Sequence, residues 1–340
     1  AGLAIGLTVD ELIEHYESLA HKVFQSRWWR RGIWRERYDE KALVAELKAV
    51  FGDRTLGDES LQTGLLIVTK RMDTGSPWPL GNNPDGTYFR AGPDADFLAN
   101  ADYPLWSVVR ASTAAPVFFA PEEITIARQP GKAPAQGLFV DGGVSPHNNP
   151  ALQAFMYATL EGFKLGWPKG KDRLLIVSLG TGSGDPSQRS SILAASDAIK
   201  ALKSLMDDCG DLVETMMQWL SNSPTARPID TEIGNLGNDL LTATPAFTYH
   251  RYQLDLYPSA IQALMPGLSS KVIERLTAMD QPKNLPTLKQ LAEKTLDAIS
   301  AEHFPEAFDL PIDSNDSNDT ELQTYRRRDN TPVTAIPLSL

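Results

Sequence analysis

The sequence lacks the cysteine pairs that are common in secreted proteins and the long apolar segments of membrane-spanning proteins. It contains one cysteine, Cys209, so no disulfide can form within the chain. No apolar run reaches the ~18 residues that a membrane-spanning helix needs. Basic residues are fewer than acidic residues, and the formal net charge of −11 gives little bulk attraction for nucleic acid. What remains has the apolar and charged content of an ordinary globular protein, and one lone thiol is compatible with a reducing, cytoplasmic compartment.

The first residues lack both a methionine and a basic segment. Residues 1–7 are mostly apolar, but the run is too short and wrongly flanked for a signal peptide. We expect it to be the end of a buried helix that begins upstream of Ala1. Thr8 and Glu11 then form a capping-box pattern, which predicts that a new helix starts here.

Short apolar runs alternate with helical patterns through the first half of the chain. Runs that are apolar on both faces predict buried strands, and their alternation with helices favours a parallel sheet sandwiched by helices. The expected strands are 65–68, 137–140 and 174–177, and the expected helices begin near 8, 41, 104 and 149. Residues 76–84, rich in proline and asparagine, predict a loop.

The pattern changes after about residue 190. We expect helices over 192–220, with an interruption near Gly210, and over 271–279 and 288–299, with one strand over 249–254. Residues 311–340 turn polar and predict a flexible tail. The expected organisation is a catalytic domain over 1–188, a mainly helical region over 189–310 and the tail.

The segment from Val140 to Pro150 carries the strongest chemical signal. Asp141 follows a buried strand, which is where α/β proteins place ligand-binding side chains. Gly142 and Gly143 follow at once and allow close approach of another backbone or a substrate. An aspartate and a glycine also form ordinary turns, so this segment alone leaves both a structural and a functional interpretation open.

Two flanking segments favour the functional interpretation. Residues 111–119 read ASTAAPVFF, and residues 178–182 read SLGTG. Together with the Asp-Gly-Gly sequence, and in this order, they resemble the patatin-like phospholipase family. The opening 6–12, GLTVDEL, resembles the stretch just after that family's nucleophile. The resemblance runs from residue 1 to about 185.

The resemblance implies a three-layer α/β fold and a lipid acyl hydrolase without a cofactor. Members of this family use a serine–aspartate dyad, with the serine in G-x-S-x-G. Carried to this chain, Asp141 would be the general base, and Gly142 and Gly143 would shape the site. The implied partner is a lipid ester or phospholipid.

This chain departs from the family pattern in one decisive respect, because G-x-S-x-G does not occur in it. The family's oxyanion loop, which precedes that motif, is missing too. We therefore expect the 340-residue chain alone to be inactive, with its nucleophile upstream of Ala1. The alternative is a non-catalytic patatin-like protein that binds lipid or regulates another protein.

Other candidate sites carry weaker signals. Residues 180–184, GTGSG, could cradle a phosphate with their amides, but they lack the lysine of a P-loop, which favours packing. His147 would suggest a triad, which the resemblance argues against. No histidine pair has the spacing of metal ligands, so we predict no metal site.

Residues 27–37 combine five arginines with three tryptophans, Trp28, Trp29 and Trp34. Indole rings and guanidinium groups suit a lipid interface, and they also suit single-stranded nucleic acid. A surface segment with its rings packed inward is the plainer interpretation. We expect either that arrangement or peripheral membrane contact, and no nucleic-acid binding.

Overall fold

The computed structural model describes residues 1–24, 38, 40–93, 95–128, 131–184, 194–278 and 281–309. The predictions for Trp28, Trp29 and Trp34 and for the tail 311–340 therefore lie outside the described residues. Within these ranges, no helix combines the length and the apolar character that a bilayer span requires.

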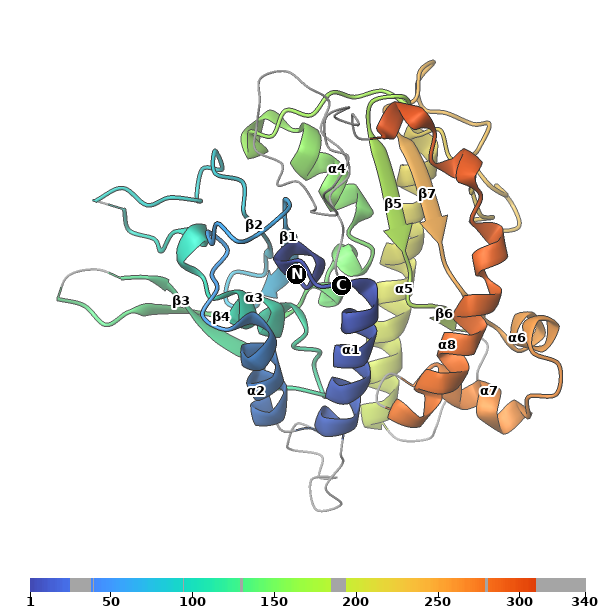
Figure 1. Ribbon diagram of the computed structural model, residues 1–340, viewed down its shortest axis with the longest axis horizontal. Coiled ribbons are helices and arrows are strands. Elements are labelled where there is room, and N and C mark those ends of the chain that lie inside the picture. The colour runs from blue at the N-terminus through green and yellow to red at the C-terminus, as the bar shows by residue number, and fades with distance from the viewer. Residues whose placement is uncertain are drawn as a thin grey trace, which may run out of the picture.

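The chain opens with a short 3-10 helix, η1 (Leu3–Ile5), which ends at Gly6 in the left-handed region. Helix α1 (Val9–Val23) follows, and the predicted capping box is confirmed. The Glu11 amide donates to the Thr8 hydroxyl, and the Glu11 carboxylate accepts from the Thr8 amide. Helix α2 (Glu40–Phe51) packs beside α1 (Figure 1).

Four strands form an antiparallel sheet in the order β2-β1-β4-β3. They are β1 (Leu66–Arg71), β2 (Pro77–Gly81), β3 (Glu122–Ala127) and β4 (Ala135–Asp141). The register of β1 against β4 places Thr69 opposite Asp141, and the Thr69 hydroxyl donates to the Val140 carbonyl at 2.7 Å. The prediction of a parallel sheet is therefore wrong for the strand that carries Asp141.

The predicted loop over 76–84 is also wrong, because residues 77–81 form β2. This strand lies at the edge of the sheet and pairs only with β1. Pro77 and Pro79 are two residues apart, so the nitrogens that lack a proton are on the same side of the strand. At an edge that side can face away from the neighbour, which is why an edge strand tolerates proline.

Both faces of this sheet carry buried apolar residues. Ile67 and Phe139 join the core that contains α2, α3 (Leu105–Ser112) and residues of the N-terminal segment. Leu66, Val68 and Val140 alternate with them along the strands, so they face the other way, and they are buried too. The predicted α/β fold with helices on both faces of a sheet is confirmed.

A parallel pair of strands forms the second part of the fold. Strand β5 (Leu175–Leu179) pairs with β7 (Thr248–Tyr252), and β6 (Ser183–Gly184) pairs with β8 (Asp255–Leu256). Helices α4 (Ala151–Thr159) and α5 (Ala194–Leu220) pack on this pair through a core that includes Ala151, Met217 and Tyr249. The all-apolar run 174–177 is thus a parallel strand as predicted.

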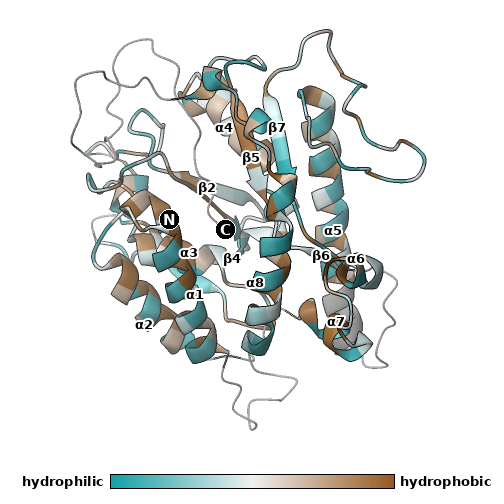
Figure 2. Ribbon diagram, turned by 45° about the vertical axis from the view of Figure 1, so that its right-hand side comes forward, coloured by the Kyte–Doolittle hydropathy of each residue, from teal (hydrophilic) through white to brown (hydrophobic). Residues whose placement is uncertain are grey.

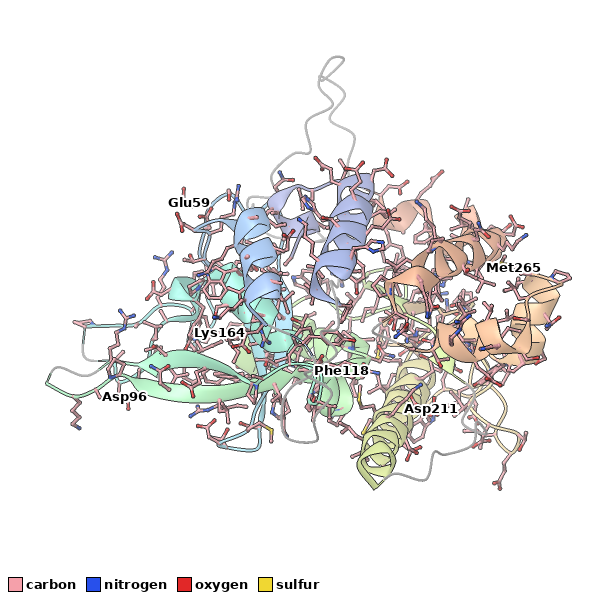
Figure 3. The ribbon with its side chains drawn as sticks, turned by 90° about the horizontal axis from the view of Figure 1, so that it is seen from below. Glu59, Asp96, Phe118, Lys164, Asp211 and Met265 are labelled. Atoms are coloured by element: carbon pink, nitrogen blue, oxygen red, sulfur yellow. The ribbon has the colours of Figure 1, made fainter. Side chains whose placement is uncertain are left out.

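The remaining helices come late in the chain and lie at the right of the molecule in Figure 1. They are α6 (Pro258–Leu264), α7 (Ser270–Leu276) and α8 (Leu285–Lys294), followed by short 3-10 turns up to Phe308. Figure 3 labels Met265, which caps α6, and Asp211, which lies within α5. Figure 2 shows that these helices alternate apolar and polar residues.

Helix α5 runs through Gly210 without the predicted interruption. Glycine costs ~1 kcal/mol against alanine inside a helix, and Val213 and Met217 anchor α5 in the core on the C-terminal side of Gly210. The proposed division at residue 188 stays a prediction. Across it, β5 pairs with β7, so hydrogen bonds join the two sides.

Candidate active site

Asp141 is the last residue of β4 and the N-cap of the short 3-10 helix η4 (Gly142–Val144). A second 3-10 helix, η5 (Pro146–Asn148), leads to Asn149 and then to α4. We call residues 141–149 the Asp141 turn. The sequence correctly placed its aspartate at the end of a buried strand.

Backbone groups fix the first end of this turn. The Asp141 amide donates to the Ala114 carbonyl at 3.1 Å, so the segment after α3 holds the aspartate in place. The Ser112 hydroxyl donates to the Val68 carbonyl at 2.7 Å, which ties the same segment to β1. Two of the three segments picked out by the sequence therefore meet at Asp141.

Gly142 and Gly143 are required by space. A Cβ at Gly142 would overlap the carbonyl oxygen of Val68, which is backbone and cannot swing aside. A Cβ at Gly143 would lie 3.1 Å from both Asn148 Oδ1 and Asp141 Oδ1. The two glycines let the chain turn tightly against β1 and around the carboxylate.

Burial makes the Asp141 carboxylate more basic. Loss of solvent raises its pKa from 3.8 to about 6, although the Gly143 amide, which donates to Oδ1 at 2.7 Å, partly offsets this. Desolvation disfavours the charged form, which is how a carboxyl group reaches a useful pKa for a general base near neutral pH. The Asp141 carboxyl group is therefore mainly ionised at pH 7, and it binds a proton more strongly than an exposed aspartate does.

Side chains fix the second end of the turn. Asn149 Oδ1 accepts from the Ala151 amide, which begins α4, and from the Ser178 hydroxyl, both at 3.2 Å. Ser178 lies on β5 and belongs to the third segment that the sequence picked out. All three segments of the family resemblance thus meet at the Asp141 turn.

The other sequence candidates have structural partners. The Gly180 amide donates to the Tyr252 carbonyl at 2.8 Å, and residues 183–184 form β6, so this glycine-rich segment extends the strands. The His147 amide donates to the Ser145 hydroxyl at 3.4 Å within the turn. Burial and, to a smaller extent, the nearby Lys70 lower the pKa of the His147 ring, which favours its neutral form.

Within the part of the chain that the structure describes, no three His, Cys, Asp or Glu side chains gather as metal ligands would. Two histidines that are far apart in the sequence, His250 and His303, do contact each other. Their rings stack with centroids 4.9 Å apart, and His303 Nδ1 and the Tyr252 hydroxyl are 2.8 Å apart.

Sequence reasoning missed Arg251. Its Nη1 donates to the Ser178 hydroxyl at 2.7 Å, so it reaches the Asp141 turn through one intervening side chain. The only signal in the sequence was an arginine within an otherwise strand-like run, 249–254, because strands that pair with buried neighbours rarely carry one.

The comparisons with known proteins support the resemblance over part of its length. The family model for Patatin-like phospholipase matches residues 1–155, a range that contains Asp141, Gly142, Gly143 and Asn149 and ends within α4. No curated protein matches the chain. Residues 1–155, which include the Asp141 turn, therefore match the patatin-like phospholipase family.

Proposed function

We propose that the chain is part of a lipid acyl hydrolase in which Asp141 is the general base of a serine–aspartate dyad. The observation that carries the proposal is the convergence of three separate segments on the Asp141 turn, whose partly buried carboxyl group has a pKa near 6. The family supplies the class of substrate, a lipid ester.

The chemistry follows from the position of Asp141. Its carboxylate accepts the proton of a serine hydroxyl as that oxygen attacks the ester carbonyl, and the alcohol leaves with a proton. Water then hydrolyses the acyl-serine with the same carboxylate as base. The glycines beside Asp141 leave room for the serine and the substrate.

The serine itself is not in G-x-S-x-G anywhere in these 340 residues. We therefore propose that this polypeptide alone does not hydrolyse esters, since removal of the nucleophile costs a serine hydrolase roughly 10⁶-fold in turnover. A fluorophosphonate probe and a p-nitrophenyl ester test this directly. The expected result is neither labelling nor turnover, and stoichiometric labelling with turnover would overturn the proposal.

The absence of the motif also favours a second candidate, a patatin-like protein that binds lipid without hydrolysing it. The coding sequence ahead of Ala1 separates the two. A G-x-S-x-G there supports the hydrolase, and Asp141→Asn in that longer protein should lower turnover on the order of 10⁴-fold. A start codon directly before Ala1 supports the binding protein.

Peripheral membrane contact through Trp28, Trp29 and Trp34, for a protein located in the cytoplasm, is a further part of the proposal. The clustering of indoles and arginines in 27–37 supports it. Replacing the three tryptophans by serine should weaken binding to phospholipid vesicles. Unchanged vesicle binding, or loss of the fold on circular dichroism, would favour rings packed in the core.

A further inference from the structure

Arg251 occupies an unusual position for a cation. It lies on β7, and burial lowers the pKa of its guanidinium, an effect that Tyr249 and Glu214 partly offset and Arg227 reinforces. Among the described residues, its two terminal nitrogens donate to uncharged acceptors and not to a carboxylate. Nη1 donates to Ser178 Oγ at 2.7 Å, and Nη2 donates to Gln253 Oε1.

Ser178 connects Arg251 to the Asp141 turn. It is 3% exposed, and its hydroxyl donates onward to Asn149 Oδ1 at 3.2 Å. Asn149 is 4% exposed and also accepts the first amide of α4. Arg251, Ser178 and Asn149 thus form a continuous hydrogen-bonded relay from β7 through β5 to the Asp141 turn.

The turn is short and internally bonded, so a shift at one end reaches the other. The Ser145 hydroxyl donates to the Gly142 carbonyl at 2.5 Å, and the Asn148 side chain lies against Gly143. The Gly143 amide is the donor that holds Asp141 Oδ1 at 2.7 Å. Loss of the anchor at Asn149 should therefore loosen the contact made at the carboxylate.

This arrangement depends on an arginine at position 251 and a glycine at position 180. The planar fork of arginine presents two nitrogens to two acceptors at once, which a lysine ammonium cannot do in the same geometry. A Cβ at Gly180 would overlap Gln253 Oε1 and lie 2.8 Å from Arg251 Nη2. Gly180 thereby keeps open the space that the Arg251–Gln253 contact occupies.

We infer that Arg251 is a positioning residue that sets the geometry of Asp141 through Ser178 and Asn149. The inference rests on the proposed role of Asp141. It extends the site beyond residue 155, where the family match ends, to two strands in the rest of the chain. The two flanking segments would then have different roles. The segment 111–119 holds Asp141 directly, and the segment 178–182 transmits the position of Arg251.

The test uses amide hydrogen exchange in the 340-residue chain, which needs no turnover. Arg251→Met should speed exchange of the Gly143 amide roughly tenfold while leaving the amides of the β1–β2 pair unchanged. It should also raise the pKa of Asp141, followed by carbon NMR, because the Gly143 amide lowers it. Arg251→Lys should give a smaller change in the same direction.

Arg227→Met is the matched control, because Arg227 pairs with Asp255 next to the same strands and, among the described residues, makes no hydrogen bond to Ser178. It should leave the Gly143 amide and the Asp141 pKa unchanged. Should Arg251→Met fail to fold, Ser178→Ala and Gly180→Ala interrupt the relay with smaller changes and should show the same local effect.

Three results would overturn the inference: unchanged exchange at Gly143, equally faster exchange throughout the chain, or the same local effect in Arg227→Met. Each of these leaves the proposed function standing, because that depends on the probe and on the upstream serine. Conversely, a chain that labels with fluorophosphonate defeats the proposed function without altering the exchange result.

Discussion

The two ends of the Asp141 turn are held by different kinds of contact. At the Asp141 end, the partners are backbone groups, the Ala114 carbonyl and the Val68 carbonyl that closes over Gly142. At the Asn149 end, the side chains of Ser178 and, beyond it, Arg251 add to the backbone amide of Ala151. The first end lies wholly within the range that matches the family, whereas the second depends on residues outside that range.

This difference has a physical consequence. Backbone contacts depend on the path of the main chain and survive most substitutions, so the sheet keeps the backbone of Asp141 in place, and the rest of the turn sets the contact at its carboxylate. Side-chain contacts can be removed one at a time without rebuilding the strands. The Asp141 end should therefore be costly to disturb, and the Asn149 end should be adjustable.

The largest expected effect tests the charge at the Asp141 end. Burial raises the pKa of Asp141 from 3.8 to about 6, so the protonated form is favoured in the folded state. Below pH 3.8 both states are protonated and no cost arises. As the pH rises towards 6 and above, the folded protein carries an ionised, desolvated carboxylate and loses about 3 kcal/mol of stability.

Asp141→Asn removes that titration but keeps an oxygen for the Gly143 amide. Its gain in unfolding free energy over the original protein should be small at pH 4 and approach 3 kcal/mol at pH 7.5, measured by urea unfolding at both pH values. A gain that does not depend on pH would mean that the carboxyl group is solvated.

The second effect tests the backbone contact. Gly142→Ala places a methyl group against the Val68 carbonyl, and overpacking of this kind should cost about 2 kcal/mol in urea unfolding. Gly162→Ala is the matched control, because a Cβ at Gly162 meets no heavy atom within 4 Å. If both variants unfold at the same urea concentration, the turn does not press on β1 as described.

The smallest effect tests the Asn149 end. Ser178→Ala removes one donor and one acceptor, but Asn149 keeps the Ala151 amide and Arg251 keeps Gln253. The expected loss is about 1 kcal/mol of unfolding free energy, less than that of Gly142→Ala. A larger loss than in Gly142→Ala would reverse the comparison between the two ends.

Local patterns in the sequence predicted the parts of the fold that depend on local chemistry. The capping box at Thr8, the buried strand before Asp141 and the parallel strand at 174–177 are all present. These features depend on the periodicity and the end residues of a single element, which a sequence shows directly.

The errors concern contacts between distant segments. An apolar run such as 137–140 is compatible with a parallel or an antiparallel sheet, so the direction of its pairing could not be predicted. Pro77 and Pro79 suggested a loop because the edge position of β2 depends on the whole sheet. The relay to Arg251 spans 102 positions from Asn149, a separation over which no local pattern operates.

The central claim is that Asp141 is a desolvated general base, and its own titration tests that claim most directly. Carbon NMR of the chain labelled in its aspartate carboxyl groups, with Asp141→Asn to assign the signal, would follow Asp141 alone. The account predicts a pKa of about 6. A pKa at or below the ordinary 3.8 would show an exposed or charge-paired carboxylate and would contradict it.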